Sequence, residues 1–137
     1  MNLVTSLPTS RLLKEAGIEQ GKSCFVWCGD KCDSFGNESY ELLTREQSQD
    51  VYSVGRDKLW DFVIAAFTTD ELLEILPGDI STAKEGGRLE IKKWSHGFEC
   101  NYFYYDQDRD SYEVFNNEDN KLLPEALASL LIKVREK

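Results

Sequence analysis

Three consecutive segments in the second half of the chain have the pattern of antiparallel strands, and they constrain the fold more than any other feature. The segments RLEIKKW, FECNYFYY and YEVFN are separated by the short polar turns SHG and DQDRDS. Alternating residues point to opposite faces of a strand, and RLEIKKW alternates apolar with charged residues in this way. Turns this short join antiparallel neighbours, because parallel strands need a long crossover. We therefore predict an antiparallel β-meander with strands at 88–94, 98–105 and 112–116.

Two helices are predicted to cover one face of this meander. TTDELLEILPGD predicts a helix over 69–76, because Thr68 and Glu71 have capping-box spacing and Pro77 ends the pattern. LLPEALASLLIKVREK predicts a second helix over 124–136. The apolar residues expected to face the core are Leu72, Leu73, Leu76, Leu127, Leu130, Leu131 and Val134.

The first half of the chain begins with similar elements. LPTSRLLKEAGIEQG predicts a short helix, capped by Thr9 or Ser10, with Gly17 after its end. Its narrow apolar side is expected to contain Leu12, Leu13 and Ala16. CFVWC and YELLT predict a strand and a return strand. Residues 45–58 are ambiguous, with DVYSV as a candidate short strand, and the apolar run KLWDFVIAAF has no clean period. The predicted fold is α+β, in the order α-β-β-(β)-α-β-β-β-α.

A length of 137 residues predicts one α+β domain over 1–137. Two subunits, 1–58 and 59–137, are an alternative. TSRLLKE and TDELLEI open helices at comparable places, so the chain could contain a duplicated helix-plus-sheet unit.

The net charge of −9 opposes direct binding to nucleic acid phosphates or to anionic membranes. The N-terminal stretch lacks a basic region and an apolar run of signal-peptide length, and no stretch has the apolar length of a membrane span. We therefore expect a cytoplasmic protein whose four cysteines are reduced.

Cys24, Cys28 and Cys32 are spaced four residues apart and raise the question of a metal site. On a strand, Cys24 and Cys28 would point the same way but lie about 13 Å apart, too far for one zinc ion. Only Cys28 and Cys32 could meet, across a turn, and the remaining cysteine and histidine ligands are Cys100 and His96. The pattern favours cysteine as a small apolar residue and predicts no cofactor; Cys28 and Cys32 are a weak metal alternative.

Asp106, Asp108 and Asp110 copy the first acidic positions of a calcium-binding loop. Ser111 then occupies the position of the required glycine, and Asn117 that of the bidentate glutamate. The pattern favours a solvated acidic turn over a calcium site.

The strand FECNYFYY divides its aromatic residues between two faces. Phe103 and Tyr105 share one face, and simple strand pairing would add Trp94 and Phe115 to it. Such a face could stack nucleic acid bases, but residues 99–120 contain seven acidic side chains and one arginine. Burial of this face by another segment or by a partner protein is favoured instead.

The motifs PTSRLLKEAG, AFTTDELLEILP, LEIKKW, YFYYD and LPEALASLLIKV occur in this order over most of the chain. The order resembles that of a group of small uncharacterised proteins from phages, prophages and mobile elements of gut Bacteroidetes. The resemblance implies a mobile-element setting and a cytosolic location. It implies no catalytic residues, because the group has no established activity.

These observations predict a non-enzymatic accessory protein that acts by binding another protein, with a basic protein as the expected partner. The residues expected at the interface are Asp106, Asp108, Asp110, Glu113, Phe103 and Tyr105. Two alternatives are left open: a metal- or calcium-binding regulatory domain that uses the cysteines or the Asp106–Asp110 turn, and a small enzyme built on dispersed carboxylates.

Overall fold

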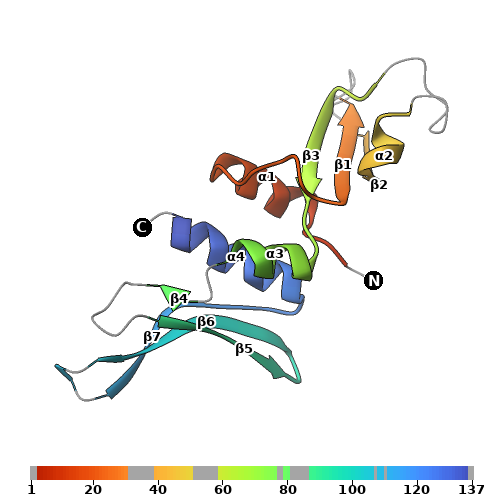
Figure 1. The fold of residues 1–137 in the computed structure, drawn as a ribbon. Coiled ribbons are helices and arrows are strands. Elements are labelled where there is room, and N and C mark those ends of the chain that lie inside the picture. Colours follow the sequence, from red (N-terminus) through yellow and green to blue (C-terminus); the bar gives the residue numbers. More distant parts are fainter. Residues whose placement is uncertain are drawn as a thin grey trace. The chain divides into compact units, whose positions relative to one another are not determined.

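The computed structural model describes residues 3–30, 39–50, 59–76, 79–80, 87–106, 108–109 and 111–135; in the strands, the side chains at 79–80, 87, 104–106 and 111–119 lie outside the description. The chain divides into two compact units, which we name the N-terminal unit (Val4–Thr68) and the C-terminal unit (Thr69–Lys137, with Met1–Leu3). Both units combine helices with an antiparallel sheet, so the predicted α+β class is confirmed (Figure 1).

The C-terminal unit contains the predicted meander. Its strands are β4 (Asp79–Ile80), β5 (Gly87–Trp94), β6 (Gly97–Asp106) and β7 (Ser111–Asn120), hydrogen-bonded in the order β4-β5-β6-β7 and all antiparallel. Helix α4 (Leu123–Arg135) packs on β6 and β7, and α3 (Thr69–Ile75) packs on α4 (Figure 1). The two predicted helices therefore lie on one side of the predicted sheet.

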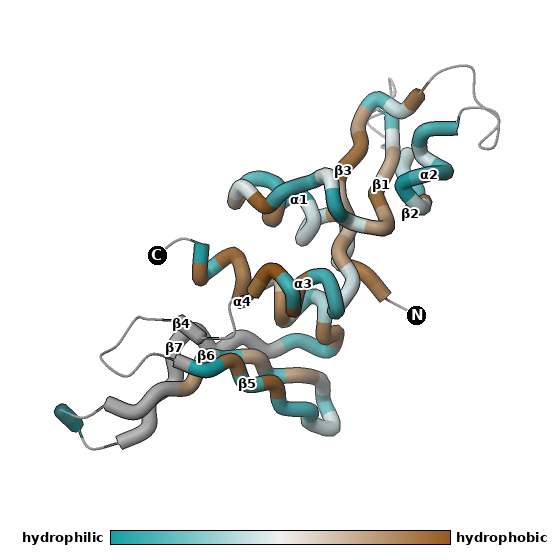
Figure 2. The backbone as a smooth tube through the Cα atoms, viewed as in Figure 1, coloured by the Kyte–Doolittle hydropathy of each residue, from teal (hydrophilic) through white to brown (hydrophobic). Residues whose placement is uncertain are grey.

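The core of the C-terminal unit lies between α4 and this sheet. Leu127 and Leu131 are buried in α4, and Cys100 and Tyr102 are buried in β6. Figure 2 shows the apolar stretch along α4 that supplies these leucines. Two of the predicted core residues, Leu73 and Val134, are only half-buried. The others of that set are buried: Leu72, Leu76, Leu127, Leu130 and Leu131.

A β-bulge changes the pairing of β7 with β6. Cys100 pairs with Glu118, but Tyr102 pairs with Phe115, so the register shifts by one residue between them. A shift of one residue exchanges the two faces of a strand. The expectation that Phe115 joins Phe103 was therefore wrong: the backbone register pairs Phe103 with Val114.

The N-terminal unit contains β1 (Phe25–Asp30), β2 (Ser39–Thr44), the short helix α2 (Arg45–Ser48) and β3 (Phe62–Ala66). Its sheet has the order β2-β1-β3, and β1 is antiparallel to both neighbours. The unassigned run KLWDFVIAAF supplies β3. In this strand Ile64, Ala65 and Ala66 are buried. In this sheet the first strand of the unit, β1, lies in the centre, whereas in the other sheet the strands lie in chain order. The two strand orders differ, so they give no support to a duplicated helix-plus-sheet unit. The candidate strand DVYSV lies outside the described residues.

Helix α1 (Leu7–Glu15) begins earlier than predicted. Its N-cap is Ser6, whose side chain accepts a hydrogen bond from the Thr9 backbone, so the assignment of the cap to Thr9 or Ser10 was wrong. Its C-terminal end follows the prediction, since Gly17 has a φ of 87°. The Gly17 and Ile18 N–H groups donate to the carbonyls of Lys14 and Leu13, which is a Schellman motif.

The start of α1 also changes which of its residues face the core. Leu7, Ser10 and Leu13 are its buried residues. Leu12 is 52% exposed, so its placement on the apolar side was wrong.

A candidate protein-binding face on the C-terminal sheet

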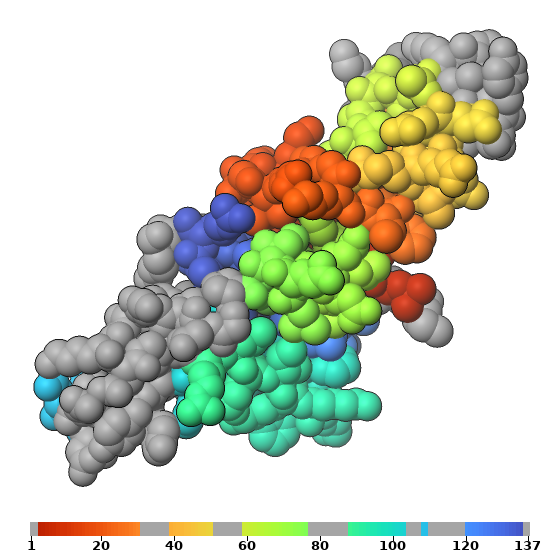
Figure 3. All heavy atoms as spheres, viewed as in Figure 1, coloured from red at the N-terminus to blue at the C-terminus, as the bar shows by residue number. Residues whose placement is uncertain are grey.

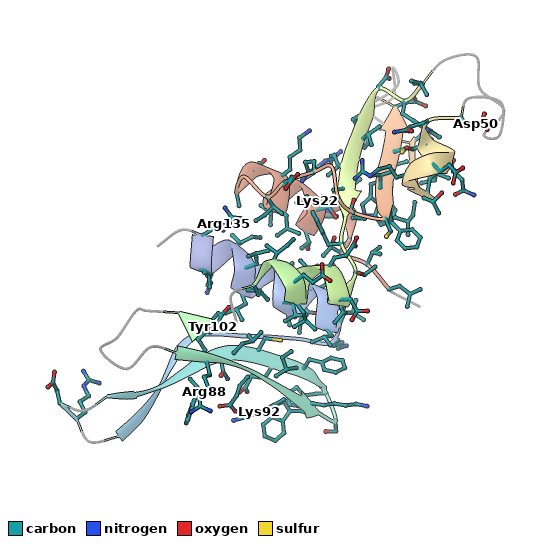
Figure 4. All side chains as sticks on the ribbon, viewed as in Figure 1. Lys22, Asp50, Arg88, Lys92, Tyr102 and Arg135 are labelled. Carbon is teal, nitrogen blue, oxygen red and sulfur yellow. The ribbon has the colours of Figure 1, made fainter. Side chains whose placement is uncertain are left out.

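The face of the C-terminal sheet that points away from α3 and α4 carries a run of alternating β5 residues together with three residues of β6. We name this surface the open face, because none of the described elements of this unit lies on it (Figure 1). Figure 4 shows Arg88 and Lys92 on this side of the sheet and Tyr102 on the side of the helices. By strand alternation and register, the open face contains Arg88, Glu90, Lys92, Trp94, Glu99, Asn101 and Phe103. Asn101 is the buried member of this set, and its side-chain amide donates a hydrogen bond to Glu99 Oε1 over 3.2 Å.

Trp94 is the most prominent apolar group of the open face. It is 47% exposed, although tryptophan is mostly buried in folded proteins. Its ring stacks on the ring of His96, with centroids 6.3 Å apart and an interplanar angle of 7°. His96 is itself exposed, so the pair forms a flat aromatic surface at the end of the β5–β6 hairpin. In Figure 3, residues of β5 and this hairpin lie at the surface of the molecule.

Gly97 allows the tight turn that positions Trp94. Ser95 and His96 form a two-residue turn, and Trp94 pairs with Gly97 across it. Gly97 has a φ of 148°, which only glycine adopts readily. A Cβ at this position would also collide with the backbone of Asn120 and Lys121. Gly97 is therefore required for the hairpin geometry.

Both signs of charge occur on the open face. Arg88 and Lys92 supply positive charge, and Glu90 and Glu99 supply negative charge. Lys92 lies directly opposite Glu99 in the strand register, and opposite charges at such a position stabilise the pairing of the two strands. The described part of this face is therefore mixed in charge, whereas the sequence predicted an acidic surface.

Of the six residues that were predicted to form one interface, the structure describes the side chains of Phe103 and Asp108. Phe103 is half-buried on the open face, and Asp108 is exposed in the turn between β6 and β7. In the backbone register of β6 and β7, Phe103 lies opposite Val114. Glu113 lies opposite the next residue of β6, Tyr104.

The remaining predicted residues are described only in part. Asp106 and Tyr105 belong to the backbone of β6 and pair with Ser111 and Tyr112. Their side chains, and Asp110 entirely, lie outside the described residues.

The cysteines do not share an orientation. Cys28 is buried within β1, whereas Cys24 precedes the strand and is exposed, so the expectation that both point the same way was wrong. Cys32, the other half of the weak metal alternative, lies outside the described residues. Burial, with a smaller contribution from the Glu99 charge, raises the pKa of Cys100 to about 11. Among the described residues, no three histidine, cysteine or acidic side chains are placed to hold a metal ion together.

Sequence reasoning treated His96 as an isolated turn residue and missed its pairing with Trp94. The available signal was a tryptophan and a histidine on either side of Ser95, at a turn before glycine. It also missed the two cations of the open face, Arg88 and Lys92, although the alternation in RLEIKKW places them on the same face as Trp94.

Comparison of the chain with protein families, with curated proteins and with solved structures finds no match. None of the helices in the described part of the chain has both the length and the apolar character needed to cross a membrane.

Proposed function

We propose that this protein acts by binding another protein through the open face, without catalysing a reaction. The observation that carries the proposal is the exposed Trp94 ring, stacked on His96 on a sheet face that no described element of its unit covers. Tryptophan and arginine contribute disproportionately to binding energy at protein interfaces. Trp94 lies on the same face as Arg88, with charged side chains around it, which is the composition of an apolar anchor within a polar rim.

The partner that we propose is a basic protein. The chain has a net charge of −9, so its field attracts positively charged surfaces and accelerates their association. The mixed charges at Glu90, Lys92 and Glu99 would then set the orientation of the partner, because like charges placed opposite each other are unfavourable. The setting that we propose is the cytoplasm of a cell that carries a phage or mobile element, in keeping with the resemblance of the sequence.

A photo-crosslinking amino acid at position 94 tests the proposal in cells that naturally express the protein. The matched control is the same amino acid at Leu12, which is comparably exposed on a helix. We expect a protein that is crosslinked from position 94 and not from position 12. Its purified form should bind the parent chain, and Trp94→Ala should weaken that binding by more than about tenfold, as for an interface hot spot.

Three outcomes would contradict the proposal. Identical crosslinked products from positions 94 and 12 would show that position 94 has no specific partner. A purified partner whose affinity is unchanged by Trp94→Ala would show that the open face is not the contact. Crosslinking of nucleic acid instead of protein would overturn the partner class, since aromatic sheet faces can also stack bases.

A further inference from the structure

Strand β2 forms an open edge of the N-terminal sheet. It pairs with β1 on one side, and within the described residues no strand pairs with its other side. Its first four residues, Ser39 to Leu42, are exposed, and Leu43 and Thr44 are half-buried. An edge strand presents a row of backbone donors and acceptors to any strand that can lie beside it.

The β2 edge lacks several of the features with which proteins usually prevent such pairing, and its one charged residue is the exposed Glu41. Lysine, proline and bulges protect edge strands, and SYELLT contains none of these. The contrast with β5 is instructive. Strand β4 pairs with Gly87 and Arg88 of β5 only. Among the described strands, the rest of β5 has no neighbour on the side away from β6, and this part of the strand contains Lys92 and Lys93. The exposed part of the β5 edge is therefore protected by lysines, and the β2 edge is not.

An apolar stripe runs along one face of the β2 edge. Tyr40 and Leu42 are 49% and 38% exposed, and Leu42 pairs with Trp27 of β1 on the same face. The rings of Tyr40 and Trp27 meet edge to face, with centroids 5.6 Å apart and an interplanar angle of 76°. A strand added beside β2 would bury the exposed parts of Tyr40 and Leu42 and gain hydrophobic stabilisation.

The sequence of β2 is complementary to itself in an antiparallel register centred on Leu42. A two-fold axis that places Leu42 opposite its own copy also places Tyr40 opposite Thr44 and Glu41 opposite Leu43. No like charges then face each other, whereas a register centred on Glu41 would place two carboxylates in opposition. The same axis keeps the apolar stripes of both copies on one face of the joined sheet.

We infer that β2 binds β2 of a second copy of this chain, which joins two three-stranded sheets into one sheet across a two-fold axis. The inference rests on the N-terminal unit alone and is independent of the proposed open-face function. Each copy carries a net charge of −9, so the two copies repel each other and added salt should strengthen their association. Salt has the opposite effect on binding to a basic partner, so the failure of one proposal is distinguishable from the failure of the other.

Sedimentation velocity over a range of protein and salt concentrations tests the inference. We expect a monomer–dimer equilibrium that shifts toward dimer with salt. Leu42→Lys should raise the dimer dissociation constant by at least about tenfold, because it places two lysines in opposition at the axis. Val63→Lys is the matched control, since Val63 is 43% exposed in the same sheet, on β3, and should leave the equilibrium unchanged. A parent chain that stays monomeric up to about 1 mM would overturn the inference.

A disulfide test fixes the register without changing charge at the axis. In a background with Cys24→Ser and Cys32→Ser, Leu42→Cys should form a disulfide-linked dimer, because directly opposed antiparallel residues have Cα atoms within disulfide range. Glu41→Cys should link poorly, since the two copies of position 41 are offset along the strands. Equal linking by both variants, or by neither, would overturn the β2 register.

Discussion

The hydroxyl oxygens of Thr5 and Ser10 lie 2.7 Å apart in the interior of the N-terminal unit, where neither residue is exposed to solvent. Thr5 Oγ1 also accepts a hydrogen bond from the Phe67 backbone, and the Thr5 N–H donates to the Phe67 carbonyl. The Thr5 carbonyl accepts from the indole Nε1–H of Trp27 over 2.8 Å. One buried threonine therefore connects α1, β1 and the chain that follows β3.

Thr5→Val should destabilise the N-terminal unit by about 1–3 kcal/mol. Valine has nearly the same shape but cannot accept from the Phe67 N–H, which would remain buried without a partner. Urea unfolding measures the change. Thr9→Val is the comparison variant: its half-buried hydroxyl accepts from Ser6 Oγ over 3.1 Å, so its loss leaves no buried backbone donor unpaired and should cost less than Thr5→Val. Equal costs for the two variants would show that the Thr5 hydroxyl has no special role.

Leu131→Ala should lower the free energy of unfolding by about 2–5 kcal/mol, because it removes a buried side chain and leaves a cavity beneath α4. Leu12→Ala makes the same chemical change at a residue that is 52% exposed, so it should have little effect. Denaturant titration followed by circular dichroism checks both values. A cost below about 0.5 kcal/mol for Leu131→Ala would contradict the packing of α4 on the sheet.

Gly97→Ala should distort the β5–β6 hairpin and lower the melting temperature. The reason is both conformational and steric, since alanine disfavours the φ of 148° and its Cβ meets the backbone after β7. Gly21→Ala is the control, because a Cβ there has no atom within 4 Å. The Gly97 variant should also weaken binding at the open face, since Trp94 is opposite Gly97. A melting temperature equal to that of the Gly21 variant would refute this account of the turn.

Cys100 should make the stability of the protein fall as the pH rises above about 9. The pKa of its thiol rises from 9.0 to about 11 in the folded chain, because burial disfavours the thiolate. Between these values the unfolded chain has released the proton and the folded chain has kept it, so rising pH favours unfolding. The contribution is complete below pH 9 and lost by about pH 11.

Urea unfolding of the parent and of Cys100→Val at a series of pH values separates this thiol from other groups. The variant should lose stability less steeply between pH 9 and pH 11. Tyr102, whose pKa burial raises to about 12, remains in both proteins and supplies the residual slope. Identical slopes for the two proteins would contradict the assignment to Cys100.

The second half of the fold was predictable because its information is local. Alternation in RLEIKKW and FECNYFYY, together with short turns, determines antiparallel strands. The leucine spacing in α4 likewise determines its buried side, as Leu127 and Leu131 show. These signals depend on neighbours within a few residues, so one sequence is sufficient to read them.

The features that the sequence did not predict depend on contacts between distant segments. The strand conformation of β3, which the sequence left unassigned, follows from its pairing with β1, where Ile64 lies opposite Trp27. The N-cap of α1 is Ser6, since the helix begins at Leu7. The preceding residue, Thr5, is buried and its hydroxyl contacts that of Ser10 in the helix. The bulge opposite Asn101 shifts the register of β7, and strand alternation carries no signal of where an extra residue is inserted.

The last prediction concerns the three aspartates at Asp106, Asp108 and Asp110. Replacing each by lysine raises the net charge from −9 to −3, because each replacement adds two positive charges. If the proposed partner is basic, the triple variant should bind it more slowly at low salt, and the difference should shrink at high salt as the charges are screened. Surface plasmon resonance at several salt concentrations measures both association rates.

The predicted effect is on association rather than dissociation, because Asp108 is exposed and long-range steering acts before contact. Trp94→Ala is the complementary variant: it should accelerate dissociation and leave the salt dependence intact, since it removes buried area but no charge. An association rate that does not depend on salt in the parent chain would reject the basic partner. A triple variant whose defect is confined to calcium-containing buffer would instead support the calcium alternative for this turn, because lysines cannot coordinate the ion.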